Sequence, residues 1–139
     1  MAAFNKFEDF MRALCEKEHN LATTGDTLKV YLSNAAPSAS ADTVIGDVAA
    51  LATGGGYTAG GEDTTNTGSE TTGMYTVAMT DVVWTASGTG IGAFQYVILY
   101  NDTHASDALI GWWDYGSAIT LTAGETFTTD FGATTLTLI

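Results

Sequence analysis

The sequence predicts a mainly β fold, an antiparallel β-sandwich or barrel with one N-terminal amphipathic helix. Three observations lead to this prediction. Runs of β-branched and aromatic residues recur between short clusters of Gly, Asn, Asp and Ser that are typical of turns. The segments between these runs are too short for the crossover helices that parallel strands need. A convincing helical spacing of apolar residues occurs only near the N-terminus.

The N-terminal segment has the 3.6-residue period of an amphipathic helix. Charged residues fill one face, and the other face carries the apolar residues Phe4, Phe7, Phe10, Met11, Leu14 and Cys15. The stretch from Asn20 to Gly25 then supplies a stop and a turn. We therefore predict a helix over residues 4–19, within an N-terminal helical element of residues 1–24. A single β domain over residues 25–139 follows it.

The β domain begins with an alternating run. In residues 27–33, Leu28, Val30 and Leu32 alternate with polar and aromatic residues, which predicts a strand with one buried face. Residues 42–51 fit either a strand or a short helix. Further strands are predicted within residues 74–84, 91–100, 108–115, 118–121, 126–131 and 134–139.

Residues 53–73 differ from the rest of the β domain. This stretch is rich in Gly and Thr and contains one aromatic residue, Tyr57, so it has little to bury. Neither flank alone has the composition of a domain, which argues against a linker. We predict a long surface loop or a projecting hairpin, and long loops in compact domains are often functional.

The length and charge of the chain exclude several functional classes. With 139 residues and a mass of 14.5 kDa, the chain is expected to form one domain. Its net charge is -12, from 4 basic and 16 acidic residues, and no Lys or Arg follows Lys29. A phosphate backbone or an anionic membrane would be repelled by such a body, so neither nucleic acid nor membrane is an expected partner.

Secretion and covalent cross-linking are not expected either. The single cysteine, Cys15, has no partner for an internal disulfide. No apolar run approaches the roughly 20 residues that span a bilayer, and the acidic N-terminus lacks the apolar stretch of a signal peptide. Packing alone is expected to hold the fold together.

Candidate metal, nucleotide and catalytic residues form no convincing constellation. Cys15 and His19 have helical i,i+4 spacing, but two ligands do not make a structural zinc site, and Cys15 is expected in the core. The glycine clusters lack nucleotide-binding spacing and have no basic residue nearby. The numerous carboxylates are interpreted as a solvated acidic surface. The alternatives are a glycosidase pair or a set of Ca²⁺ ligands, drawn from Asp102, Asp107 and Asp114 or from Glu62 with Asp63. We predict no enzyme, no metal and no cofactor.

The most conspicuous aromatic cluster is Leu109-Ile-Gly-Trp-Trp-Asp-Tyr115. In a strand, Trp112 and Trp113 point to opposite faces, so one can lie in the core while the other meets solvent, a sugar or a partner subunit. Gly111 can permit a close backbone approach or a bulge. We favour one core tryptophan and one at a subunit boundary over a carbohydrate-binding module.

Several distinctive blocks are distributed along nearly the whole chain, namely Phe4–Phe7, His19–Leu21, Asp26–Pro37, Gly56–Gly61, Leu99–Thr103, Leu109–Ser117 and Gly124–Phe131. Together they resemble a family of small structural proteins of tailed bacteriophages. The resemblance implies a non-enzymatic, β-rich virion subunit present in many copies. The stretch from Glu62 to Gly73 departs from the family pattern, because it is polar and Thr-rich where the family has a strand.

Within a virion assembled in the host cytoplasm, we expect a capsid decoration (cement) protein that binds the outer face of the major capsid protein. The alternative is a tail or fibre-associated protein that contacts host glycan or adjoining tail subunits. A small hydrolase is a third class with almost no support in the sequence. The resemblance also implies a homo-oligomer, with a trimer as one form. The expected partner-binding residues are Phe4, Lys6, Phe7, Arg12, Trp112, Trp113 and Tyr115.

Overall fold

The fold consists mainly of strands in antiparallel sheets, as the sequence predicts. The computed structural model describes residues 2–139. In chain order, these residues form β1 (Phe4–Lys6), α1 (Asp9–Cys15), β2 (Leu28–Ser33), the 3-10 helix η1 (Ile45–Asp47), β3 (Glu62–Thr64), β4 (Asn66–Thr71), β5 (Met74–Met79), β6 (Val82–Thr85), β7 (Ile91–Asn101), β8 (Leu109–Leu121), β9 (Thr126–Thr129) and β10 (Leu136–Leu138).

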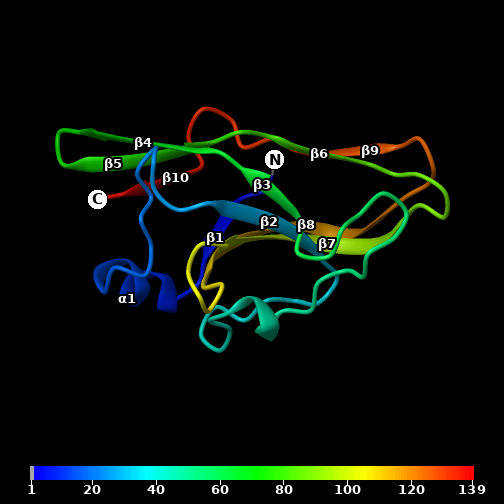
Figure 1. The fold of residues 1–139 in the computed structure, drawn as a ribbon, viewed down its shortest axis with the longest axis horizontal. Coiled ribbons are helices and arrows are strands. Elements are labelled where there is room, and N and C mark those ends of the chain that lie inside the picture. Colours follow the sequence, from blue (N-terminus) through cyan, green and yellow to red (C-terminus); the bar gives the residue numbers. More distant parts are fainter. Residues whose placement is uncertain (1) are drawn as a thin grey trace.

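The strands form three sheets. The largest has the order β1-β8-β7-β2-β3, and the two smaller sheets have the orders β10-β5-β4 and β6-β9. The two smaller sheets lie together over one face of the five-stranded sheet, whereas α1 and the segment around η1 lie on its other side (Figure 1). The sheets do not close on one another into a barrel.

Both faces of the central strands are buried. Leu28, Val30 and Leu32 of β2 belong to the main apolar cluster, which also contains residues of the smaller sheets such as Val77 and Trp84. The sequence predicted one buried face for this strand, and that prediction is wrong. The second face carries Tyr31, whose hydroxyl donates to the Val48 carbonyl at 3.0 Å, within a second cluster that Phe7 and Val48 complete.

The predicted helix over residues 4–19 is wrong in its length. Phe4–Lys6 form a strand instead, and α1 covers only Asp9–Cys15. The helix ends because Lys17 adopts a left-handed backbone with φ of 67°. Its amide donates to the Leu14 carbonyl while the Glu18 amide donates to Ala13, which is the Schellman arrangement of a helix C-terminus.

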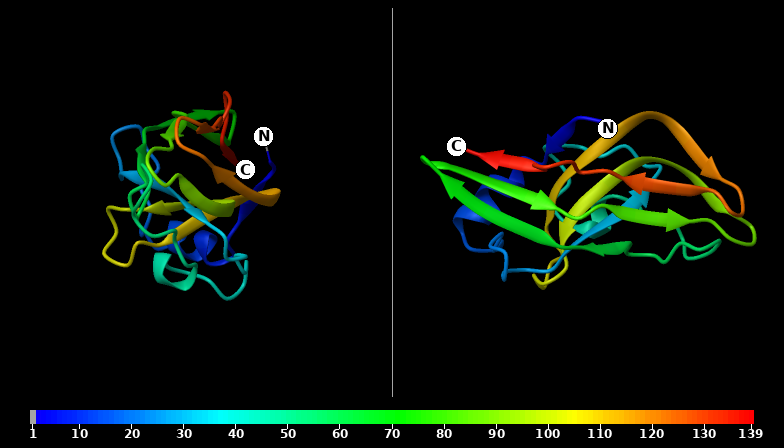
Figure 2. Two further views of the ribbon diagram at one scale, coloured as in Figure 1. Left: turned by 90° about the vertical axis from the view of Figure 1, so that its right-hand side faces the viewer. Right: turned by 90° about the horizontal axis from the view of Figure 1, so that it is seen from above.

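Strands form in much of the Thr-rich stretch. The prediction left a loop or a hairpin open for residues 53–73, and the structure contains β3 and the β4–β5 hairpin within and after it. Thr72 and Gly73 both have positive φ, 52° and 84°, as a two-residue type I′ turn requires. The hairpin extends at the end of the molecule where the C-terminus lies (Figure 2).

Two further strand predictions differ in their boundaries. The single run predicted over residues 74–84 is divided between β5 and β6, which belong to different sheets. Asp81 lies at the break, and its carboxylate accepts a hydrogen bond from the Phe131 amide at 2.8 Å. Conversely, residues 109–121 form one strand, β8, that passes through Gly116 at a φ of 80°.

Candidate partner-binding edge

The N-terminal residues and the aromatic motif predicted to bind a partner lie side by side. Strand β1 pairs with β8 so that Phe4 opposes Trp113, Asn5 opposes Trp112 and Lys6 opposes Gly111. More than 100 residues separate these segments in the sequence. We call the surface formed by β1 and the neighbouring residues Gly111–Tyr115 of β8 the β1 edge.

Gly111 allows the two strands to approach. A side-chain Cβ at this position would lie 2.2 Å from the Phe4 ring and 2.5 Å from the Asn5 carbonyl oxygen. A register shift between β7 and β8 also falls beside it, between Leu99 and Tyr100. The sequence had suggested either a close approach or a bulge here, and both are present.

The two tryptophans have different environments. Trp113 is only 2% exposed and packs against Phe4 and Phe131, each with ring centroids 5.2 Å apart. Trp112 is half-buried on the opposite side, where its ring lies 4.6 Å from that of Phe7. The prediction that the two side chains occupy opposite faces, with one in the core, is confirmed.

Burial divides the predicted partner-binding residues into two groups. Phe7 and Trp113 are buried and unavailable to a partner without rearrangement. Phe4, Trp112 and Tyr115 are half-buried, and Lys6 and Arg12 are exposed. Tyr115 packs edge-on against Phe127, with ring centroids 5.1 Å apart. The exposed charged residues of the β1 edge are therefore Lys6 and Asp114, and Phe4, Trp112 and Tyr115 add the outer surfaces of half-buried rings.

Strand β1 has one free side. It pairs with β8 alone among the described residues, so its outer backbone groups have no strand partner. Such an edge can accept an additional strand from another chain, and an exposed lysine is a common device that limits indiscriminate pairing. Lys6 is placed at this edge, and no carboxylate of residues 2–139 forms an ion pair with it.

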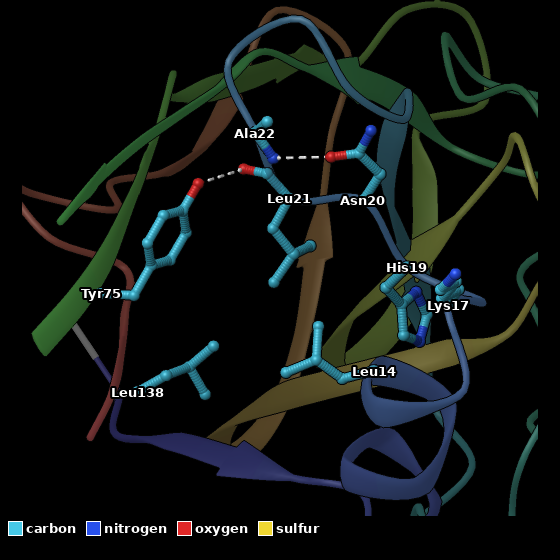
Figure 3. Close-up of a pocket in the computed structure, with 8 residues that line it drawn as sticks. All are labelled: Leu14, Lys17, His19, Asn20, Leu21, Ala22, Tyr75 and Leu138. Carbon is cyan, nitrogen blue, oxygen red and sulfur yellow. Dashed lines mark hydrogen bonds between the residues drawn. The ribbon is translucent and has the colours of Figure 1, made fainter. Parts of the chain in front are cut away.

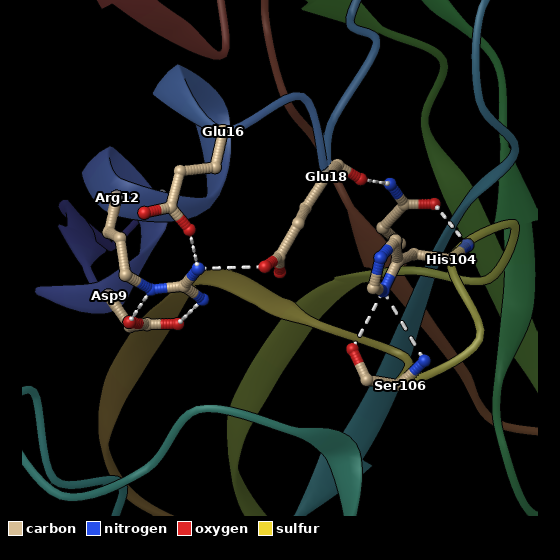
Figure 4. A network of polar contacts seen from close by, with 7 residues as sticks. Asp9, Arg12, Glu16, Glu18, His104 and Ser106 are labelled. Atoms are coloured by element: carbon tan, nitrogen blue, oxygen red, sulfur yellow. Dashed lines mark hydrogen bonds and ion pairs between the residues drawn. The ribbon is translucent and has the colours of Figure 1, made fainter.

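Arg12 lies on α1 in a cluster of opposite charge (Figure 4). Its guanidinium binds Asp9 at 2.7 and 2.8 Å, Glu18 at 2.7 Å, and also Glu16. These hydrogen bonds lower the pKa of the Asp9 and Glu18 carboxyl groups and raise that of Arg12. One cation thus meets three carboxylates, and this part of α1 presents net negative charge rather than a basic surface.

Lys29 is also paired. Its ammonium lies 3.5 Å from Asp102 and 3.7 Å from Asp63. Of the four basic residues, only Lys6 and Lys17 have no ion pair within residues 2–139. The four also lie on β1, on α1, just after α1 and on β2, so they do not share one helix.

The residues weighed for metal binding or catalysis are dispersed. In the described part of the chain, no group of three or more His, Cys, Asp or Glu side chains could hold a metal ion. Cys15 is exposed, so the prediction that it lies in the core is wrong. The reason is the phase of α1, which buries Phe10 and Ala13 instead. Asp114 accepts a hydrogen bond from Gln95 at 2.9 Å, which lowers its pKa.

A pocket of about 580 Å³, which the sequence did not indicate, lies between α1, the chain after it and the β4–β5 hairpin (Figure 3). Its wall combines residues from three distant segments, namely Leu14, Lys17, His19, Asn20, Leu21, Ala22, Tyr75 and Leu138. The hairpin is tied to the connecting chain, because the Asn66 amide donates to the Leu21 and Ala22 carbonyls at 3.0 Å each. No local sequence signal predicts such a contact.

His19 is the buried titratable group in this wall. It is 5% exposed, and burial lowers the pKa of its imidazole to about 4. Its Nδ1 lies 3.1 Å from the Asn101 side-chain nitrogen, while Nε2 has no hydrogen-bond partner among residues 2–139. At neutral pH the ring is therefore uncharged.

Comparison of this chain with models of known protein families, with curated proteins and with solved structures found no match. Within residues 2–139, no helix is long and apolar enough to cross a membrane.

Proposed function

We propose that this chain is a structural subunit of a tailed-bacteriophage virion, assembled in the host cytoplasm. Its proposed role is that of a capsid decoration (cement) protein, which binds the outer face of the major capsid protein and stabilises the head. The proposal assigns no catalytic role, metal or cofactor. The stacking of the smaller sheets on the five-stranded sheet supports classing the fold as an open β-sandwich.

The observation that carries the proposal is the β1 edge. The blocks Phe4–Phe7 and Leu109–Ser117, which contribute to the phage resemblance, pair with each other there. This edge has an open strand side and an unpaired cation, Lys6, whereas the chain after Lys29 contains eleven carboxylates and no basic residue. A shell partner with a complementary strand edge and local negative charge would thus meet β1, while the acidic body would face water.

A pair of charge reversals tests this orientation. Lys6→Glu and Lys17→Glu change the net charge equally, and both lysines are exposed and free of ion pairs in the described chain. We expect Lys6→Glu to weaken binding to undecorated heads roughly tenfold or more, while Lys17→Glu binds as the parent chain does. Equal binding by all three proteins would refute the role of the β1 edge.

Deletion of the N-terminal segment is a poor test of the same idea. It would remove Phe7 and Phe10, which are 0% and 1% exposed, from the two apolar clusters. Loss of binding would then report unfolding. The location of the chain in the particle is tested separately. Purified particles are partially disrupted, and empty heads and free tails are analysed by mass spectrometry. Detection of the chain in tails alone would refute the cement role.

The half-buried ring of Trp112 favours a second candidate, a tail or fibre-associated protein that contacts host glycan or adjoining tail subunits. Aromatic rings that keep one face accessible are common at sugar and protein contacts. Binding of the intact protein on a glycan array, lost in Trp112→Ala, would support this candidate. If the intact protein gives no signal on the array, contact with host glycan is refuted and only contact with adjoining tail subunits is left of this candidate.

A homo-oligomer, with a trimer as one form, remains part of the proposal. Many of the apolar side chains that could form subunit contacts are instead buried in the two apolar clusters of the single chain. The large apolar side chains left exposed in residues 2–139 are Met11, Met74, Val83 and Ile139, and Val83 of β6 is 55% exposed. Sedimentation at low and high salt measures the assembly state, and a monomer under both conditions would refute the oligomer for the isolated protein.

A further inference from the structure

We propose that the pocket between α1 and the β4–β5 hairpin binds a small organic anion, an aliphatic or aromatic body that carries a carboxylate. Its volume of about 580 Å³ lies within the usual range of small-molecule sites. This inference does not depend on the virion role, because the β1 edge contributes no residue to the wall.

The pocket separates apolar from polar groups. Leu138 and the Tyr75 ring lie at one end, Leu14 and Leu21 lie in the middle, and His19, Lys17 and Asn20 lie at the other end (Figure 3). An amphiphilic ligand would place its apolar body against the leucines and its charged group at the polar end. An apolar lining with a few polar groups that fix orientation is the usual composition of a ligand site.

The charge of the wall points to an anion. In a chain with a net charge of -12, this wall contains Lys17, an uncharged histidine and no carboxylate of its own. The two carboxylates whose charges act most strongly on His19 are engaged elsewhere: Glu18 binds Arg12, and Asp26 accepts from the Asn20 backbone amide and the Asn101 side chain. The ammonium of Lys17 has no ion pair within residues 2–139, in contrast to Arg12 and Lys29. The wall is thus a part of the surface where a negative group meets an unneutralised cation.

An unpaired donor in the same wall is the second observation. The Asn101 Oδ1 accepts hydrogen bonds from the amides of Thr103 at 2.9 Å and His104 at 3.2 Å, so the amide group is fixed and its nitrogen faces His19. That nitrogen also donates to the Asp26 carboxylate at 2.6 Å and to the Glu18 carbonyl at 3.1 Å, and these two acceptors take up its hydrogens. Because an amide nitrogen does not accept hydrogen bonds, the His19 Nδ1 that faces it carries no hydrogen. The neutral ring therefore carries its hydrogen on Nε2, which is buried without a partner in the described chain.

A buried donor without an acceptor is unfavourable, because it has lost water and gained nothing in return. Nε2 has almost no exposed surface in the structure, so a ligand oxygen would reach it after a local movement of the wall and would then supply the missing acceptor. The carboxylate would accept from the imidazole and form an ion pair with the ammonium, and no covalent step is involved.

The test compares two probes of the same length, octanoate and octylammonium, by NMR titration of the intact ¹⁵N-labelled chain. We expect octanoate to shift the signals of residues 17–22 and of the His19 Nε2, with saturation in the micromolar to millimolar range. We expect octylammonium to bind at least tenfold more weakly at this site, although the acidic protein as a whole attracts cations. Equal or tighter binding of octylammonium, or no saturable shift with octanoate, would overturn the proposal.

Two pairs of variants locate the site. Ala22→Trp fills the pocket from an exposed wall position and should abolish octanoate binding, whereas Ala123→Trp, at an exposed turn elsewhere, should not change it. Lys17→Gln should weaken binding roughly fivefold, and Lys6→Gln should leave it unchanged. If Lys6→Gln and Lys17→Gln weaken octanoate binding equally, the probe responds to the net charge of the protein and not to the pocket, and the assignment is wrong. Head binding is a separate assay on undecorated heads, where Lys6 and not Lys17 is expected to matter, so failure of either proposal is recognised separately.

Discussion

The contact between β1 and β8 predicts that one added methyl group at Gly111 lowers the free energy of unfolding. In Gly111→Ala, the new Cβ would lie 2.2 and 2.4 Å from two atoms of the Phe4 ring and 2.5 Å from the Asn5 carbonyl oxygen. The Phe4 ring can turn away, but the carbonyl belongs to the backbone of β1, so the strand itself must move. Overpacking of this kind costs about 1–3 kcal/mol, and we expect about 2 kcal/mol of the free energy of unfolding to be lost.

Gly92→Ala provides the matched control. Gly92 lies on β7, and a Cβ there would meet no atom within 4 Å. Alanine restricts the unfolded chain more than glycine does, so this variant should be as stable as the parent or more stable by about 0.5 kcal/mol. Both substitutions add the same methyl group, and the difference between them isolates the contact with β1.

Urea unfolding followed by tryptophan fluorescence measures the loss, and thermal unfolding should show a midpoint about 6–8 °C lower for Gly111→Ala. Hydrogen exchange supplies a local readout. The Phe7 amide donates to the Ile110 carbonyl at 3.2 Å, and it should exchange faster in Gly111→Ala than in Gly92→Ala. Equal unfolding free energies and equal exchange for the two variants would refute the placement of β1 against β8.

Two further predictions concern buried side chains. Trp113→Ala should lower the free energy of unfolding by about 3–5 kcal/mol, because the ring is 2% exposed. Trp112→Ala should lower the free energy of unfolding by less, since its ring is only partly buried. Urea unfolding measures both variants, and a larger loss for Trp112→Ala would refute this order. The pKa of His19, lowered from 6.5 to about 4, means that the unfolded chain binds the proton more tightly than the folded chain. Stability should therefore fall by up to about 3 kcal/mol as the pH drops from about 6.5 to 4, and unfolding curves of His19→Gln should lack that slope.

Patterns of local contacts made much of the β domain predictable. The alternation of Leu28, Val30 and Leu32 located β2, and the aromatic run from Leu109 to Tyr115 located the first half of β8. The opposite faces of Trp112 and Trp113 followed from the two-residue period of a strand alone. The pattern could not show that the second face of β2 is also buried, because the residues that pack on it, Phe7 and Val48, lie outside the strand in the sequence.

The N-terminal error has a related cause. Phe4, Phe7 and Phe10 have a spacing of three, which is equally compatible with a helix and with a short strand followed by a turn into a helix. The pairing of β1 with β8 decides between these, and it is a contact across more than 100 residues. Once α1 begins at Asp9, its phase exposes Cys15 and leaves Met11 41% exposed.

The distribution of charge gains a sharper meaning from the structure. By sequence, the chain divides into a nearly neutral N-terminal part and an acidic remainder, but two of the four cations, Arg12 and Lys29, are already neutralised by neighbouring carboxylates. The cations left without an ion pair in the described chain are Lys6 and Lys17, and they lie at two different features, the β1 edge and the pocket. A single attachment surface that used the whole basic segment would make both lysines contribute to every interaction. Separate features predict that Lys6 affects head binding alone and that Lys17 affects anion binding alone, so the two pairs of lysine variants, measured in both assays, distinguish the two arrangements.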